Sequence, residues 1–318
     1  MNRLTNSFQI LSLDGGGIKG LFSAAVLAKW EEDLGCLISD HFDLIVGTST
    51  GGIIALGLGL GLRPREIVQF YLGQGERIFP NGWTGAYRTV RQFVASKFSP
   101  NPLRVALQNC FGEKLLGHST KRLAIPSYDL GQGEVRVFKT AHNERLRRDF
   151  KLPAWKIALA TSAAPTYFPA FRDIEDRRLI DGGVWANNPL MLGIVEALAV
   201  LKIPHESISA LSLGTTEPVK RRHDRLDAGG FWQWKIDAAD VIMCSQSVAA
   251  TAQATLLLGH DSLLRVNAKV PEGVFSLDKL TADKLIAAAS HQSLHTAPEI
   301  QQRFLNHRAS DFVPCYSI

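Results

Sequence analysis

The stretch of the chain most suited to chemistry is the turn from Gly47 to Gly51, GTSTG, in which Ser49 lies between two glycines. An apolar strand is expected before the turn, over 42–46, and an apolar helix is expected to begin at Thr50 or Gly51. This arrangement is typical of a nucleophile elbow, a sharp strand-to-helix turn whose flanking glycines leave room for the neighbouring backbone. It predicts strained backbone angles at Ser49. It also places free N–H groups of the helix beside the hydroxyl, where they can stabilise an oxyanion.

Three other interpretations of residues 44–61 compete with a nucleophile elbow. The stretch is long and uncharged enough for a transmembrane helix, but it contains six glycines, and no Lys/Arg cluster flanks it on one side. A phosphate-binding loop would require a following Gly-Lys-Ser/Thr sequence, which is absent. A glycine-rich turn without catalytic function stays open as long as this motif is considered alone.

A second glycine-rich turn, Asp14 to Gly20 (DGGGIKG), follows a buried strand expected over 8–13 and precedes a helix expected over 21–34. Its spacing formally matches the fingerprint of dinucleotide-binding proteins, which also requires an acidic residue at the end of the second strand. In this chain the second strand ends in the turn with Ser49, and the acidic residue is missing. We therefore favour an oxyanion loop for residues 14–20, in which glycine N–H groups converge on one oxygen. Because parallel strands end at one edge of a sheet, the two glycine-rich turns are expected to face each other.

A serine nucleophile needs a base to take its proton, and the sequence offers two kinds. The chain has nine histidines, but none lies in a glycine-rich loop typical of a catalytic triad. The alternative is Asp181, which ends a strand expected over 178–180 and is followed by Gly182 and Gly183. Its carboxylate is expected at the carboxyl edge of the sheet beside Ser49, where burial would have to raise its proton affinity. The histidines considered as alternatives are His41, His118, His142, His205 and His223.

Composition limits the possible classes of protein. The 318 residues are 46% hydrophobic and 20% charged, which favours one large globular domain over a disordered chain. A net charge of +5 suits an anionic membrane surface or a phosphorylated ligand but does not by itself indicate nucleic acid. Four widely spaced cysteines form no CxxC pair, and no apolar run long enough for a signal peptide precedes Asp14. We therefore expect a cytoplasmic protein without a metal or other cofactor.

Strand and helix patterns alternate along the chain without a repeat or a linker, which predicts one doubly wound α/β domain over 1–318. Residues 73–102 mix glycine, proline, aromatic and basic residues. They are expected to form either a lid or membrane-facing cap over an apolar site, or a surface helix over 86–97. Residues 216–318 are expected to form a helical C-terminal part of the same domain. Further strands are expected over 121–129, 134–140, 207–214 and 263–266, and further helices over 64–72, 153–160, 189–201, 231–258, 281–289 and 298–307.

Four motifs together resemble the patatin-like phospholipase family. They are the glycine-rich turn 14–20, the elbow 47–51, the block AAPTYFP at 163–169 and the sequence DGG at 181–183. Their order and spread cover residues 8–215, and the joint match is far more specific than any single motif. The resemblance implies a three-layer α/β/α fold with a mostly parallel central sheet, and a Ser–Asp dyad that uses neither a catalytic histidine nor a metal.

The family's functional residues can be carried over by motif. The resemblance implies that Ser49 is the nucleophile and Asp181 the general base. The oxyanion hole is implied to consist of backbone N–H groups of the glycine-rich turn and of the elbow helix, those of Gly15, Gly16, Gly17 and Thr50. The residues implied to support these motifs are Lys19, Gly47, Gly51, Gly182 and Gly183.

The resemblance implies a cytoplasmic lipid acyl hydrolase that contacts the inner membrane peripherally and hydrolyses fatty acyl esters of glycerophospholipids. The opening residues FQILSLDGGGIKGLF and the elbow GTSTGG are also similar to bacterial phospholipase effectors of antiphage defence, which a cyclic nucleotide activates. Basic groups at 145–148 or 220–222 could meet such a phosphate, although solvated surface explains each of them as well. A homodimer is a further expectation, and no nucleic-acid partner is expected.

Two alternatives stay open at this point. One is an α/β-hydrolase esterase with a Ser-His-Asp triad. The other is a non-catalytic nucleotide-binding module that uses the turn from Gly15 to Gly20.

Overall fold

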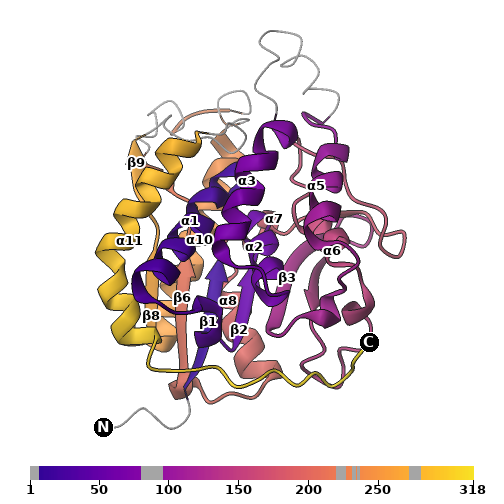
Figure 1. Ribbon diagram of the computed structural model, residues 1–318. Helices are drawn as coiled ribbons and strands as arrows, with labels where there is room; N and C mark the ends of the chain where they lie inside the picture. The colour runs from indigo at the N-terminus through magenta and orange to yellow at the C-terminus, as the bar shows by residue number, and fades with distance from the viewer. Residues whose placement is uncertain (1–6, 80–95, 220–226, 231–233, 235–236, 272–280) are drawn as a thin grey trace.

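A seven-stranded sheet runs through the part of the chain that the computed structural model describes, residues 7–79, 96–219, 227–230, 234, 237–271 and 281–318 (Figure 1). Neighbouring strands follow the order β4-β3-β2-β1-β6-β8, and β5 pairs with β3. All pairings among β1, β2, β3, β6 and β8 are parallel, whereas β4 and β5 run antiparallel to β3. The strands are β1 (Phe8–Leu13), β2 (Leu44–Gly47), β3 (Arg122–Asp129), β4 (Glu134–Lys139), β5 (Leu179–Asp181), β6 (Ile208–Leu213) and β8 (Leu263–Val266).

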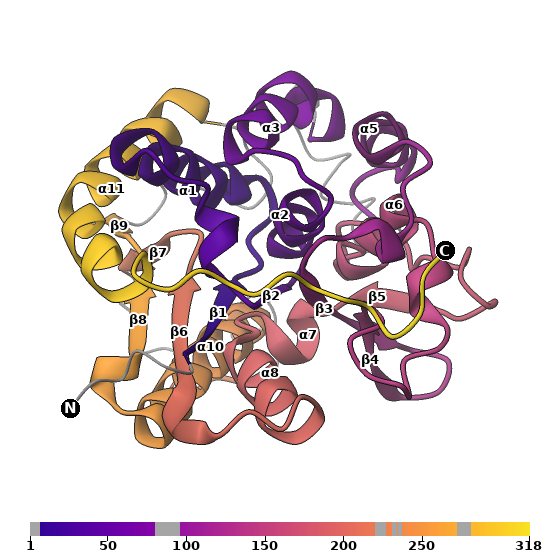
Figure 2. The same cartoon turned by 60° about the horizontal axis from the view of Figure 1, so that its bottom comes forward.

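Helices cover both faces of this sheet, as Figure 2 shows. On one face α1, α2, α3 and α11 lie side by side, with α5 and α6 beside them, and on the other face lie α7, α8 and α10. This confirms the predicted three-layer α/β/α fold with a mostly parallel sheet. The helices are α1 (Gly20–Leu34), α2 (Thr50–Gly59), α3 (Pro64–Ile78), α5 (Asn101–Phe111), α6 (Ala154–Thr161), α7 (Gly183–Ala186), α8 (Leu190–Val195), α10 (Asp237–Leu258) and α11 (Ala282–Phe304).

The two layers of helices bury very different amounts of apolar surface. The larger core lies under α1, α2, α3, α5, α6 and α11, and Trp30 and Phe22 of α1 are among its fully buried side chains. The smaller core lies under α8 and α10, and among the described side chains of α10 one, Ala254, is buried in it. Most of the apolar burial that stabilises the described part of the fold therefore lies on the α1 side of the sheet.

The order of the strands fixes where a site can form. From the central strand β1 the chain moves to β2 and β3 on one side, while β6 and β8 lie on the other side. In open α/β sheets such a reversal opens a crevice outside the carboxyl ends of the strands. The turns that follow β1, β2 and β6 all meet at this edge.

Residues 44–61 form β2 and the buried helix α2, in agreement with the argument against a membrane span. Other sequence-based expectations need correction. Helix α3 continues to Ile78, so the expected insertion at 73–102 begins later. Its residues 80–95 lie outside the described residues, and they include all of the expected helix over 86–97 except its last two residues, which are not helical. The expected helices over 281–289 and 298–307 are one helix, α11, with Pro298 inside it. Its packing along α1 maintains the helix through the proline.

Helix α10 is unusual for a surface helix. Within the described residues it is the one helix that is long and apolar enough to cross a membrane, by length and composition alone, over Asp240–Leu258. Only 11% of that stretch is buried. Several of its large apolar side chains are exposed, namely Ile242, Val248, Leu256 and Leu257. Nearby, a small two-stranded sheet that was not predicted pairs β7 (Glu217–Val219) with β9 (Lys269–Pro271).

Candidate active site

The elbow between β2 and α2 has the strained geometry that its glycines predict. Ser49 has φ 55° and ψ −121°, a conformation that L-residues rarely adopt. A Cβ atom at Gly47 would lie 2.1 Å from the carbonyl oxygen of Gly51, and one at Gly51 would lie 2.2 Å from the carbonyl oxygen of Leu13. Side chains are therefore excluded on both sides of the turn. The strain is held in place because the Ser49 N–H donates to Thr161 Oγ1 at 3.0 Å, and Thr161 Oγ1 donates to a backbone carbonyl of β3.

Ser49 and Asp181, which are 132 positions apart in the sequence, come together at this elbow. Both residues are buried, with 9% and 5% of their surface exposed. Burial raises the pKa of the Asp181 carboxyl from 3.8 to about 6, while hydrogen bonds from the Ser49 side chain and the Gly183 N–H oppose the rise. The Gly183 N–H donates to Asp181 Oδ1 at 2.7 Å and so fixes the carboxylate. A carboxylate of this proton affinity, in contact with a serine hydroxyl, is suited to act as a general base near neutral pH.

Asp181 reaches the elbow on a strand that runs against the parallel strands. β5 is antiparallel to β3, with Asp181 opposite Ser127, whereas the register of β2 and β3 ends at Val46 opposite Ala124. β3 therefore continues past β2, and β5 comes back from beyond the carboxyl edge until Asp181 lies at that edge. Gly182 allows the close approach, since a Cβ atom there would lie 2.4 Å from the Pro126 carbonyl oxygen. The sequence predicts the location of Asp181 but not the direction of its strand.

The glycine-rich turn after β1 faces the elbow from the other side. A Cβ atom at Gly15 would lie 3.3 Å from Ser49 Cβ. The Gly15 N–H, however, already donates to the Asn187 carbonyl oxygen at 2.9 Å. Its implied role in an oxyanion hole is therefore corrected, because a donor engaged by the backbone is not available to a substrate. Within the described residues the N–H groups of Gly16, Gly17 and Thr50 donate to no other residue.

The remaining motif residues support this geometry. A Cβ atom at Gly16 would lie 2.1 Å from Thr215 Oγ1, so the turn packs tightly against the end of β6. Lys19 Nζ donates to the Thr216 carbonyl oxygen at 3.1 Å, which ties the other end of the turn to the same segment. Thr50 lies at the first position of α2, so the positive end of this helix faces the site.

A cavity of about 1180 Å³ opens beside the two turns. Ser49 and Asp181 line it together with the glycine-rich turn, and most of its remaining wall is apolar. Aromatic residues form one part of this wall, and α10 forms another with Ile242, Met243 and Val248. Polar residues of the β7–β9 region, including Asn267 and Lys269, also line it. The aromatic residues are Phe70, Tyr71, Phe79, Tyr167 and Phe168.

The histidines considered as an alternative base lie elsewhere. Among the described residues that line the cavity there is no histidine. His142 is buried against Thr140 and Glu196, and His41 contacts the carbonyl oxygen of His307. His118 Nδ1 accepts from the backbone N–H of Leu115, and His205 contacts Glu206. His223 lies outside the described residues. In the described part of the chain, no group of three or more His, Cys, Asp or Glu side chains could hold a metal ion.

Three residues at the site were not found from the sequence. Thr161 accepts from the Ser49 N–H, and its only sequence signal was its position just before the AAPTYFP block. The Asn187 carbonyl holds Gly15, and Asn187 Oδ1 lies between Gly15 and Gly183. Arg265 pairs with Asp14 from the C-terminal part of the chain, where no motif pointed to it.

Comparison with known proteins identifies the family of this chain. The sequence profile of patatin-like phospholipases matches residues 11–194, more than half of the chain. The chain is 38% identical over 221 residues to a protein of Escherichia coli, and 33% identical over 260 residues to one of Pseudomonas aeruginosa, both named cGAMP-activated phospholipase. These matches cover 65% and 80% of this chain, and 62% and 77% of the two relatives. The chain therefore spans less than two thirds of the E. coli protein.

A solved structure supports the fold independently. VipD from Legionella pneumophila superposes with a TM-score of 0.51 over 93% of this chain and 67% of the other, at 12% sequence identity. At that identity the likeness concerns the fold alone. Taken with the sequence profile and the 33% identity over 80% of its length, these matches show that the chain belongs to the patatin-like phospholipase family.

Proposed function

We propose that the chain is a serine lipid acyl hydrolase that cleaves fatty acyl esters of glycerophospholipids with a dyad of Ser49 and Asp181. One observation carries this proposal. A serine on a strained elbow contacts a buried carboxyl group whose pKa is raised to about 6, and both line a large apolar cavity. The family membership supports the same chemistry, since the matched segment 11–194 contains both residues.

The proposed reaction has two steps. In the first, Ser49 Oγ forms a bond to the ester carbonyl carbon while its proton passes to Asp181, and the carbonyl oxygen becomes an oxyanion. The free N–H groups of Gly16, Gly17 and Thr50 stabilise this oxyanion, and the loss of one such donor typically costs about 3 kcal/mol of transition-state stabilisation. Asp181 then gives its proton to the leaving alkoxide, and an acyl-enzyme is left.

Deacylation repeats these roles with water. Asp181 takes a proton from a water molecule, which attacks the acyl carbon, and the fatty acid leaves as Ser49 recovers its proton. The apolar wall of the cavity is suited to an acyl chain, because burial of each methylene group contributes about 0.8 kcal/mol to binding.

The substrate class implies contact with a membrane, and helix α10 supports it. From Val241 to Leu258 this helix carries no charged residue. Ile242 and Val248 line the cavity and yet are 52% and 62% exposed, so one helix forms a wall of the site and an apolar outer surface. An exposed apolar surface of this kind is typical of an interaction site. We propose peripheral contact with the inner membrane from the cytoplasm, where the free cysteines of the described chain would stay reduced.

Regulation by a cyclic nucleotide is the finer part of the proposal. It is supported by the relatives from E. coli and P. aeruginosa, whose names describe activation by cGAMP. The basic residues expected to meet a phosphate give no decisive support, because Arg147 lies over Tyr316, Arg148 pairs with Glu175, and 220–222 lie outside the described residues. The expected homodimer and the expected lack of a nucleic-acid partner stay predictions.

Lipid mass spectrometry tests the hydrolase. Vesicles of phosphatidylethanolamine and phosphatidylglycerol are incubated with wild type, Ser49→Ala and Asp181→Asn, each with and without a panel of cyclic di- and trinucleotides. We expect free fatty acid and lysolipid from the wild type, and at least about a thousandfold less from each variant. Full wild-type activity without any nucleotide would contradict the switch but not the hydrolase. Activity retained by Ser49→Ala would contradict the dyad.

A further inference from the structure

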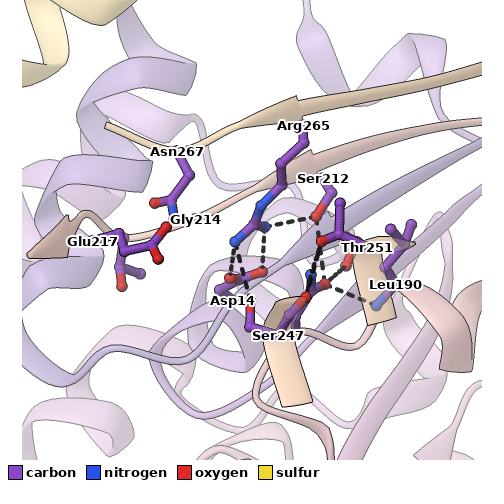
Figure 3. Close-up of polar contacts among 12 residues, drawn as sticks. Asp14, Leu190, Ser212, Gly214, Glu217, Ser247, Thr251, Arg265 and Asn267 are labelled. Atoms are coloured by element: carbon purple, nitrogen blue, oxygen red, sulfur yellow. Dashed lines mark hydrogen bonds and ion pairs between the residues drawn. The ribbon is translucent and has the colours of Figure 1, made fainter. Parts of the chain in front are cut away.

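The glycine-rich turn is tied to the C-terminal part of the chain by an ion pair between Asp14 and Arg265 (Figure 3). The guanidinium donates from Nη1 to Oδ1 at 2.8 Å and from Nη2 to Oδ2 at 2.5 Å. Nη1 also donates to Ser212 Oγ at 2.7 Å, and Nη2 lies 3.4 Å from Ser247 Oγ of α10. A bidentate pair fixes the relative position of its two groups, because both hydrogen bonds must be kept at once.

Arg265 reaches Asp14 across a neighbouring strand. β6 lies between β1, which Asp14 follows, and β8, which carries Arg265. Gly214, the residue after β6, leaves the space for this crossing (Figure 3). A Cβ atom at Gly214 would lie 3.0 Å from Arg265 Nη2 and 2.3 Å from Asn267 Oδ1. The absence of a side chain at this position thus has a clear role, which is to let the guanidinium pass.

The pair is buried deeply enough for each partner to depend on the other. The Asp14 side chain is 5% exposed and that of Arg265 is 18% exposed. Burial raises the pKa of the Asp14 carboxyl, and the Arg265 guanidinium opposes that rise, with Lys19 and Glu217 as the further charged groups nearby. Without Arg265, Asp14 would have to take up a proton or turn toward water in the cavity that it lines. Either change affects the residue directly before Gly15.

The other contacts of the turn hold its first residues and leave the proposed oxyanion donors free. The Asp14 N–H donates to the Leu213 carbonyl oxygen at 3.0 Å, and Thr215 Oγ1 donates to the Gly15 carbonyl oxygen at 3.3 Å. Gly16 and Gly17, whose N–H groups are free, come directly after Asp14 and Gly15 in the chain. The direction in which these N–H groups point therefore depends on how firmly Asp14 and Gly15 are held. A displacement of about 1 Å at this point is enough to lower catalysis markedly.

We propose that Arg265 is a positioning residue which, through Asp14, holds the glycine-rich turn in the geometry that binds the oxyanion. The inference rests on the proposed acyl-transfer function. Arg265 lies outside the segment 11–194 that matches the family profile. The C-terminal part of the chain therefore completes the catalytic site as well as covering the sheet.

The test compares a ligand that forms an oxyanion with one that does not. Palmityl trifluoromethyl ketone accepts Ser49 Oγ at its carbonyl carbon and becomes a tetrahedral oxyanion, whereas the matching methyl ketone binds without this step. For Arg265→Gln we expect kcat on p-nitrophenyl butyrate to fall about 30- to 100-fold, while KM changes by less than about threefold. The inhibition constant of the trifluoromethyl ketone should rise in parallel, and that of the methyl ketone should stay within about twofold. Arg265→Lys keeps the positive charge but not the bidentate geometry, so it should recover only a minor part of the loss.

A matched control exists at the opposite edge of the sheet from Arg265. Arg136 of β4 forms an ion pair with Asp149, with 21% and 10% of the two side chains exposed, and it does not line the cavity. Arg136→Gln should lower the melting temperature to a similar degree as Arg265→Gln, with unchanged kcat and unchanged inhibition by both ketones. Asp14→Asn should reproduce Arg265→Gln, and the double variant should be no worse than either single variant.

The outcomes separate the inference from the proposed function. If Arg265→Gln weakens both ketones equally, or loses only thermal stability as Arg136→Gln does, the positioning role is wrong and the hydrolase stands. If the wild type, both with and without the panel of cyclic nucleotides, neither hydrolyses the ester nor binds the trifluoromethyl ketone more tightly than the methyl ketone, the proposed function fails and the inference fails with it.

Discussion

The two faces of the central sheet are built in different ways (Figure 2). On one face α1, α2, α3 and α11 bury a large core, and they include the fully buried Trp30 and Phe22. On the other face, the described side chains of α10 include one that is buried in a small core and several large apolar ones that are exposed. The first face has the composition of a stabilising layer. The second combines little burial with residues that line the cavity, which is the combination expected of a surface that meets a substrate or partner.

The largest effect on the free energy of unfolding is expected from a substitution on the face of the sheet that α1 covers. Trp30 is fully buried in α1, and its Nε1 donates to Thr296 Oγ1 of α11 at 3.2 Å. Trp30→Ala should lower the free energy of unfolding by about 3–5 kcal/mol, because it removes apolar contacts and leaves a cavity. The matched substitution on the other face, Leu256→Ala of α10, should change it by less than about 0.5 kcal/mol, since Leu256 is 88% exposed. Urea denaturation measures both, and equal effects would remove the distinction between the faces.

A second effect concerns the stability cost of the proposed general base, Asp181. The pKa of Asp181 is raised from 3.8 to about 6, so the folded protein binds this proton more tightly than the unfolded chain does. The stabilisation of the folded protein by this proton is therefore complete below the unfolded pKa and is lost as the pH rises through about 6. The free energy of unfolding changes by about 3 kcal/mol over this range. Asp181→Asn should remove this part of the pH dependence of the free energy of unfolding.

Measurements of unfolding at several pH values between 4.5 and 8 provide the comparison. Asp311→Asn, at an exposed site in the C-terminal segment, serves as the control and should follow the wild-type curve. In the wild type, kcat/KM should rise with pH through about 6 as the carboxyl group loses its proton. A wild-type stability curve that runs parallel to that of Asp181→Asn would contradict the raised pKa.

The smallest effect is expected from a substitution on the outer surface of α10. It should change the binding of the protein to vesicles and nothing else. Leu256 is 88% exposed and does not line the cavity, so Leu256→Glu should leave stability and hydrolysis of p-nitrophenyl butyrate unchanged. Its affinity for phosphatidylglycerol vesicles should fall about tenfold, since a charge replaces an apolar side chain at the membrane surface. Leu294→Glu on α11, which is also an exposed leucine, is the matched control on the other face. Equal loss of vesicle binding in both variants would show that α10 is not the contacting surface.

Much of the site was foreseeable from local sequence patterns. Glycines at positions 47 and 51 around Ser49 favour a tight strand-to-helix turn, and the observed φ of 55° at Ser49 agrees with that expectation. The alternation of strands and helices predicted the layers, because each element has a period that local residues determine. The prediction failed where the local signal misled, as at Pro298, which favours a break but lies inside α11. There the contacts of α11 with α1 outweigh the local cost of a proline.

What the sequence by itself determined is the choice of Ser49 and Asp181 as the candidate reactive residues and the order of the elements that carry them. Only the tertiary structure decided that β5 runs antiparallel and returns Asp181 to the elbow, that the Gly15 N–H is engaged by Asn187, and that Arg265 crosses β6 to reach Asp14. The physical reason is the same in each case. Hydrogen bonds and ion pairs between residues far apart in the chain depend on the register and packing of whole elements, and no local pattern of residue types encodes that register.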